Sequence, residues 1–178
     1  MSMPKLLLEG MLKAPLTEAA PLTDEAELAE LAAHVDFAAR RRLGRSLSIR
    51  QVDAGSCNGC ELEIHALANP YYDLERFGLR FVASPRHADV LLVTGPVTAN
   101  MREALERTYA ATPAPKWVVA SGDCAMGTGL LCGGYACAAG VADVLPVDLR
   151  IPGCPPSPTA LLKGLLTLLA DAPAKAGR

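Results

Sequence analysis

The sequence predicts an α/β protein, a doubly wound parallel sheet with helices on both faces. Short apolar segments alternate along the chain with segments of helical periodicity, as in βαβ units. The segment "ADVLLVTG" (88–95) is a nearly uninterrupted apolar run, which is typical of a central parallel strand. Most of the expected strands end in a glycine-containing turn, where a parallel sheet connects to its next helix.

Residues 1–45 are expected to form an N-terminal helical arm that precedes an α/β domain at 46–178. Residues 1–22 contain prolines and little periodicity, so they are expected to be extended. Asp24 is a candidate cap for an amphipathic helix that ends at Gly44. Three arginines (Arg40, Arg41 and Arg42) suit the negative end of that helix, and they could be solvated or contact a membrane surface or an acidic partner.

The remaining elements follow from the same patterns. Alternating or apolar segments predict strands at 46–55, 78–84, 88–95, 116–122 and part of 142–153. Helical spacing predicts helices directly after Cys60 and at 98–111 and 157–170. Ser157 is the expected cap of the last helix and Pro158 its first residue. Thr98 is a candidate cap for the helix that follows it.

Composition and charge restrict the function classes. The 178 residues are 51% hydrophobic and 20% charged, which is a globular composition. A net charge of −2 and 4% aromatic residues give no basis for binding nucleic acid. No apolar run is long enough for a signal peptide or a membrane span, so a cytoplasmic location is expected, and disulfides are rare there.

Four of the six cysteines follow predicted strands. Cys57 and Cys60 follow the first strand in "GSCNGC", Cys124 lies in "SGDCAMGTG", and Cys154 lies in "IPGCPPSP". Ligands of an open parallel sheet bind beyond the carboxyl ends of its strands. These four thiols are therefore expected at one edge of the sheet, although 97 positions separate the first from the last.

Three chemistries are compatible with this pattern. The "CNGC" pair at a helix start could exchange thiols and a disulfide, but that leaves Cys124 and Cys154 without a role. A structural zinc usually uses two C-x-x-C pairs, and the chain has one. A cubane iron–sulfur cluster needs four thiolates on loops that approach it closely. Cys132 and Cys137, in an apolar segment, are interpreted as buried free thiols, with a local redox pair as the alternative.

Four segments, "GSCNGCELEI", "SPRHADVLLVTGPVT", "SGDCA" and "VLPVDLRIPGCPPSPTALLKGLL", resemble the small electron-transfer subunit shared by respiratory complex I and membrane-bound [NiFe] hydrogenases. The resemblance spans residues 46 to about 170, and its cysteine intervals of 63 and 29 residues fit the family pattern. It implies a flavodoxin-like fold and one [4Fe–4S] cluster held by Cys57, Cys60, Cys124 and Cys154. The chain would then relay electrons in an oxidoreductase complex, with no independent catalysis.

The first cysteine pair indicates the branch of this family. Complex I subunits of this kind typically have two adjacent cysteines there, whereas Asn58 and Gly59 separate the pair in this chain. That form resembles group 4 hydrogenases, including formate hydrogenlyase, and a subunit delivering electrons to quinone is the alternative. The resemblance implies three kinds of partner: a large catalytic subunit, a ferredoxin-like iron–sulfur subunit and membrane subunits. It places the complex on the cytoplasmic face of the inner membrane.

Other polar residues are weaker candidates. Glu61, at the start of the helix after Cys60, is expected either to cap helix amides or to transfer a proton beside the cluster, as the resemblance implies. Arg86 could tune the cluster as a nearby cation or form a surface ion pair. Asp53 is expected to accept hydrogen bonds from the amides of the turn that follows it.

Overall fold

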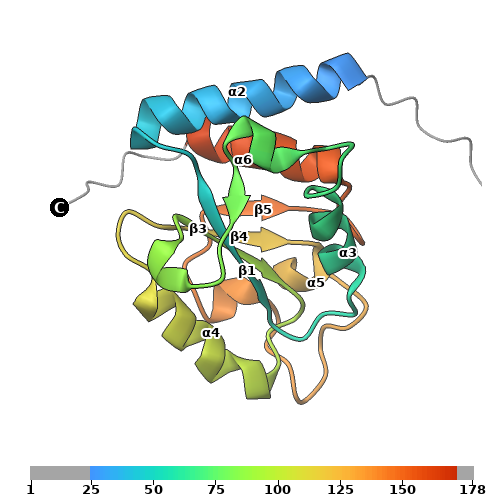
Figure 1. Cartoon of the computed structure of the whole chain (residues 1–178). Coiled ribbons are helices and arrows are strands. Elements are labelled where there is room, and N and C mark those ends of the chain that lie inside the picture. Colours follow the sequence, from blue (N-terminus) through green and yellow to red (C-terminus); the bar gives the residue numbers. More distant parts are fainter. Residues whose placement is uncertain (1–24, 172–178) are drawn as a thin grey trace, which may run out of the picture.

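The computed structural model describes residues 25–171 and confirms the doubly wound parallel sheet (Figure 1). Five strands pair in the order β2-β1-β3-β4-β5, and every neighbouring pair is parallel. This 2-1-3-4-5 order is that of flavodoxin-like folds. Residues 1–22 and Asp24, for which an extended arm and a helix cap were predicted, lie outside the described residues.

The strands are short, and all helices except α5 (Asp123–Met126) are longer than the strands. The strands are β1 (Ser48–Asp53), β2 (Arg80–Phe81), β3 (Val90–Thr94), β4 (Trp117–Ser121) and β5 (Leu149–Ile151). The helices are α2 (Glu25–Leu43), α3 (Gly59–Ala66), α4 (Ala99–Ala111), α5 (Asp123–Met126) and α6 (Pro158–Asp171). Three 3₁₀ turns complete the described chain: η1 (Leu74–Phe77), η2 (Pro85–His87) and η3 (Val141–Asp143).

Two predicted strands are much shorter than expected. At 78–84 only two residues pair, because the segment lies at the edge of the sheet and Ser84 already caps η2. At 142–153 the chain first forms η3, and Pro152 follows the last residue of β5. Proline has no amide hydrogen to donate to a sheet, so pairing ends there.

Strands β3 and β4 are buried along their whole length, as expected for the centre of a sheet covered on both faces. Alternate residues face opposite cores. One core contains Val90, Leu92, Trp117 and Val119 with residues of α2, α3 and α6, and the other contains Leu91 and Val93. Figure 1 shows α2 and α6 on one face and α4 on the other.

The N-terminal helix belongs to the first of these cores. Val35 and Ala39 of α2 are fully buried there, and Leu31 packs against the same cluster. The helix ends at Leu43, and Gly44 follows with a φ of +68° while its amide donates to the Arg40 carbonyl. The predicted end at Gly44 is thus confirmed.

The ends of α4 and α6 differ in how they are capped. Ser157 Oγ accepts a hydrogen bond of 3.3 Å from the Ala160 amide, which confirms the predicted cap of α6. Thr98 occupies the N-cap position of α4, as predicted, but its side chain makes no capping bond. Its amide instead donates to the Ala54 carbonyl and ties the loop after β1 to the start of α4.

A buried carboxylate closes the amino edge of the sheet. Asp89 is 2% exposed and accepts hydrogen bonds from Arg45 and from the Ser48 amide, the latter at 2.9 Å.

We expect Asp89→Ala to lower the free energy of unfolding by about 1–3 kcal/mol, because the buried Ser48 amide loses its side-chain acceptor. Urea denaturation measures this change.

The matched control is Glu103→Ala, which removes an exposed ion pair with Arg107. Exposed pairs of this kind contribute about 0.5 kcal/mol or less, so the control should unfold almost like the unmodified protein. Equal losses in the two variants would contradict a special role for Asp89.

Candidate functional site

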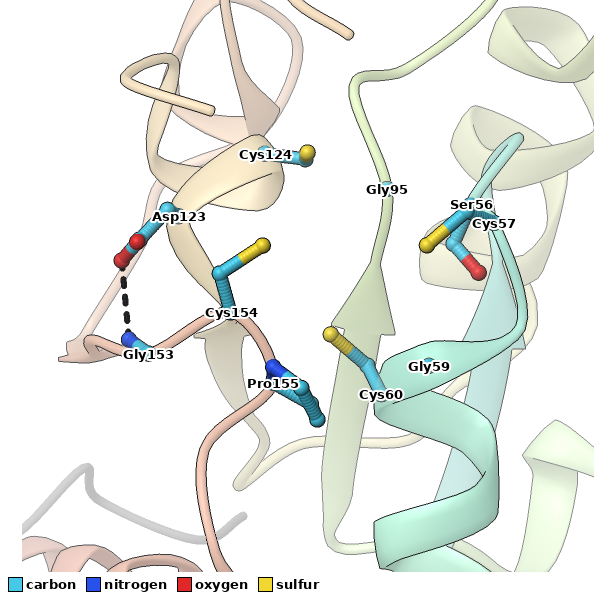
Figure 2. Close-up of a pocket in the computed structure, with 10 residues that line it drawn as sticks. All are labelled: Ser56, Cys57, Gly59, Cys60, Gly95, Asp123, Cys124, Gly153, Cys154 and Pro155. Atoms are coloured by element: carbon cyan, nitrogen blue, oxygen red, sulfur yellow. Dashed lines mark hydrogen bonds between the residues drawn. The ribbon is translucent and has the colours of Figure 1, made fainter. Parts of the chain in front are cut away.

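Four cysteines line one hollow at the carboxyl edge of the sheet (Figure 2). Cys57 lies in the loop after β1, Cys60 is the second residue of α3, Cys124 lies on α5 after β4, and Cys154 follows β5. Figure 2 shows the four sulfur atoms directed into the space between these loops. The full lining comprises Ser56, Cys57, Gly59, Cys60, Gly95, Asp123, Cys124, Gly153, Cys154 and Pro155. The loops that the sequence analysis placed at one edge therefore do meet.

Two glycines allow this close approach. A Cβ atom on Gly122 would lie 2.6 Å from Cys60 Sγ, and one on Gly95 would lie 2.5 Å from the Ser56 amide nitrogen. Both residues also have a positive φ, 91° and 81°, which side chains other than glycine rarely adopt. The backbone itself thus forms part of the wall around the thiols.

Two aspartates hold the cysteine loops in position. Asp53 Oδ1 accepts hydrogen bonds of 2.8 Å from the amides of Gly55 and Ser56, which confirms the predicted turn. Asp123 Oδ1 accepts a 2.8 Å bond from the Gly153 amide, and its own amide donates to the Gly153 carbonyl. The loop that carries Cys124 is thereby fixed to the loop that carries Cys154. This second link spans 30 residues, and nothing local in the sequence indicates it.

The Glu61 carboxylate is buried beside Cys60. It is 6% exposed and accepts hydrogen bonds from the hydroxyls of Ser56 and Thr94. These hydroxyls, rather than the helix amides expected from the sequence, are its partners. Thr94 ends β3, so Glu61 joins α3 to the centre of the sheet under the cysteine loops. Nothing local in the sequence indicates this role of Thr94, which depends on tertiary packing.

Arg86 lies at the other edge of the sheet. It belongs to η2, which precedes β3, and its side chain is exposed. All strands run in the same direction, so the five residues of β3, roughly 16 Å long, separate Arg86 from the cysteine edge. Arg86 is not among the residues that line the hollow. Its position does not support the expected role of a cation beside a cluster.

The cysteines also influence one another electrostatically. Burial, followed in decreasing order by the charges of Glu61, Cys57, Cys124 and Cys154, raises the pKa of the Cys60 thiol to about 11. Burial disfavours a thiolate, and neighbouring negative charges add to that effect. A bound cation would reverse this balance, because a coordinating thiol is deprotonated.

The donor set fits the thiolate ligands of an iron–sulfur cluster. A single zinc requires its thiolate sulfurs about 2.3 Å from a common point. Within residues 25–171, no group of three or more His, Cys, Asp or Glu side chains is arranged to hold a metal ion. A cubane instead presents a separate iron to each thiolate, so its ligands surround a shared space. The hollow, with four thiols from three loops around it, has that arrangement.

The other two cysteines lie outside the hollow. Cys132 and Cys137 are free thiols, as expected. Both are partly exposed, so the expectation that they are buried is wrong. Cys132 Sγ donates a 3.3 Å hydrogen bond to the Cys124 carbonyl, and partial burial raises the pKa of the Cys132 thiol. The segment around them presents apolar side chains to solvent, with Leu130 96% exposed and Tyr135 fully exposed.

Comparison with known proteins gives concordant results. Residues 57–168, more than half of the chain, match the family described as the 20 kDa subunit of NADH ubiquinone oxidoreductase. A probable membrane-bound hydrogenase subunit of Pyrococcus furiosus is 47% identical over 127 residues, which cover 71% of this chain and 76% of the relative. Formate hydrogenlyase subunit 7 of Escherichia coli is 44% identical over 129 residues, which cover 72% of this chain but only 51% of that protein.

Two solved structures have similar folds. A chain of the membrane-bound sulfane sulfur reductase, an archaeal respiratory membrane complex, superposes with a TM-score of 0.64 at 33% identity, covering 80% of this chain and 79% of the other. A chain of an NAD⁺-reducing [NiFe]-hydrogenase superposes with a TM-score of 0.57 at 19% identity, covering 75% and 96%. No helix in the described part of the chain has the length and apolar character to span a membrane.

The raised pKa of Cys60 leads to a test on metal-free protein. Near pH 8, we expect iodoacetamide to modify Cys60 roughly tenfold more slowly than a thiol with a pKa of about 9.0, because the reagent attacks the thiolate. The rate should keep rising up to about pH 11. Peptide mass spectrometry measures the modification rate of Cys60, with the exposed Cys154 as the internal reference. Equal rates at Cys60 and Cys154 would contradict the burial of Cys60.

Proposed function

Because this chain belongs to the family of the 20 kDa subunit of NADH ubiquinone oxidoreductase, we propose that it relays single electrons in an oxidoreductase complex through one [4Fe–4S] cluster. The proposal rests on one observation, the hollow at which Cys57, Cys60, Cys124 and Cys154 meet. These four residues would be the ligands. The cluster, when bound, would accept and release one electron at a time, and the chain would set its potential through burial, nearby charge and hydrogen bonds.

Within this family, we assign the chain to a membrane-associated [NiFe] hydrogenase complex of the formate hydrogenlyase type. The names of two relatives, at 47% and 44% identity, support this branch. So does the separation of the first two cysteines by Asn58 and Gly59. The chain would exchange electrons with a [NiFe] site in a large subunit and receive or deliver them through a ferredoxin-like subunit.

The exposed apolar side chains near the cysteines support a partner at this edge. Leu130 and Tyr135 are exposed in the segment after Cys124. Exposed large apolar groups gathered in one region often mark a protein interface. We assign this region to the large catalytic subunit, and we place the chain on the cytoplasmic face of the membrane, attached through membrane subunits of the complex.

A second candidate is a subunit that delivers electrons to quinone, which the family description itself favours. The sequence of the large subunit distinguishes the two, because two C-x-x-C pairs there would supply nickel ligands. A structural zinc without electron transfer is the alternative from another class. It is disfavoured because structural zinc sites usually use two C-x-x-C pairs, and this chain has one.

The ligand assignment predicts a sharp division among the six cysteines. Serine at position 57, 60, 124 or 154 should abolish or greatly weaken the EPR signal of the reduced cluster, whereas Cys132→Ser and Cys137→Ser should retain it. The substitutions are made in the anaerobically purified complex, with iron content measured alongside. Activity that survives the loss of Cys124 and Cys154 would instead favour dithiol chemistry confined to the Cys57/Cys60 pair.

We also assign Glu61 a role in proton transfer at the boundary with the large subunit. Its burial beside Cys60 and its two hydroxyl partners support this role.

Glu61→Gln should lower the rate of H₂ turnover by the complex by at least about tenfold while leaving its iron content unchanged, since the amide cannot carry the proton.

Glu63→Gln provides the matched control. Glu63 lies on the same helix but is not among the residues that line the hollow, and it interacts with Tyr72, whose pKa is raised by burial, by Tyr71 and by Glu63. This variant should keep its turnover. Unchanged turnover in Glu61→Gln with a full cluster would remove the proposed role.

A further inference from the structure

One buried hydroxyl at the cysteine edge has no partner. Ser121, the last residue of β4, is fully buried, and its Oγ makes no hydrogen bond to the described residues. A buried polar group left without a partner costs about 1–3 kcal/mol. Such groups are rare in folded proteins and indicate a missing ligand, ion or water.

The sheet places this hydroxyl under the start of α3. Ser121 shares a face of β4 with Trp117 and Val119, which pack in the same core as Ile64 of α3. In the neighbouring strand β3, Thr94 is paired with Ser121. The Thr94 hydroxyl donates a hydrogen bond to Glu61. The two oxygens of Glu61 accept hydrogen bonds from Thr94 and Ser56, and neither accepts one from Ser121.

The residue after Ser121 packs against a cysteine sulfur. Gly122 directly follows Ser121, and a Cβ atom on Gly122 would lie 2.6 Å from Cys60 Sγ. The Cys60 sulfur therefore packs against the backbone next to the unpartnered hydroxyl. A serine side chain can reorient among three staggered rotamers, and its hydroxyl hydrogen rotates to suit an acceptor.

We propose that the Ser121 hydroxyl donates a hydrogen bond to a sulfur of the bound cluster, either Cys60 Sγ or an adjacent sulfide, and so raises its reduction potential. This inference rests on the proposed function, because it requires the cluster. A hydrogen bond to an acceptor strengthens as negative charge accumulates on it. The reduced cluster carries one more electron than the oxidised one, so the donor stabilises the reduced state more.

The test is a redox titration of the intact complex followed by EPR. Ser121→Ala should lower the midpoint potential by up to about 59 mV. For a one-electron couple, this shift corresponds to a tenfold change in the reduction equilibrium. Ser121→Thr retains the hydroxyl and should stay close to the unmodified potential. Ser48→Ala removes another fully buried strand hydroxyl, but at the amino edge of the sheet, and should not shift the potential.

A second measurement detects the proton itself. Pulsed EPR in ordinary and deuterated water should reveal an exchangeable proton coupled to the cluster that is lost in Ser121→Ala. If that variant fails to assemble, Ser121→Gly removes the same donor and should give the same downward shift. An unchanged potential in a cluster-loaded variant without the hydroxyl would overturn the inference alone. An unmodified complex in which this chain holds no cluster would overturn the proposed function instead.

Discussion

The structure depends on the parallel hydrogen-bonded register of its central strands. Residues 49–53 of β1 pair one to one with β3, β3 pairs in the same way with β4, and β4 with β5. This register brings the carboxyl ends of β1, β4 and β5 to the same edge. Each of those ends continues into a loop with one or two of the four cysteines. Thiols far apart in the sequence therefore meet without any contribution from a disulfide.

The two edges of the sheet are built differently. At the amino edge, Asp89 forms a closed, fully bonded contact with Arg45 and Ser48. At the carboxyl edge, Asp53 and Asp123 bond to loop amides, and those amides shape a hollow rather than filling it. Polar groups thus stabilise both edges, but only one presents reactive side chains to a shared space. The unpartnered Ser121 belongs to this second edge.

The sequence predicted those features that depend on local chemistry or on the direction of strands. The helix end at Gly44, the cap at Ser157, the turn at Asp53 and the meeting of the cysteine loops are all of this kind. Features that depend on tertiary neighbours were missed. Thr94 and Ser56 bond to Glu61, and Asp123 to the Gly153 amide, across separations of 33, 5 and 30 residues. Arg86 lies at the opposite edge from the cysteines, and its sequence motif does not indicate on which edge it lies.

The central claim is that four thiolates share one cubane, and metal analysis of the anaerobically purified protein tests it most directly. The account predicts about four irons and four acid-labile sulfides per chain, with negligible zinc. One zinc per chain, or no metal in a folded protein with four titratable thiols at this edge, would contradict it.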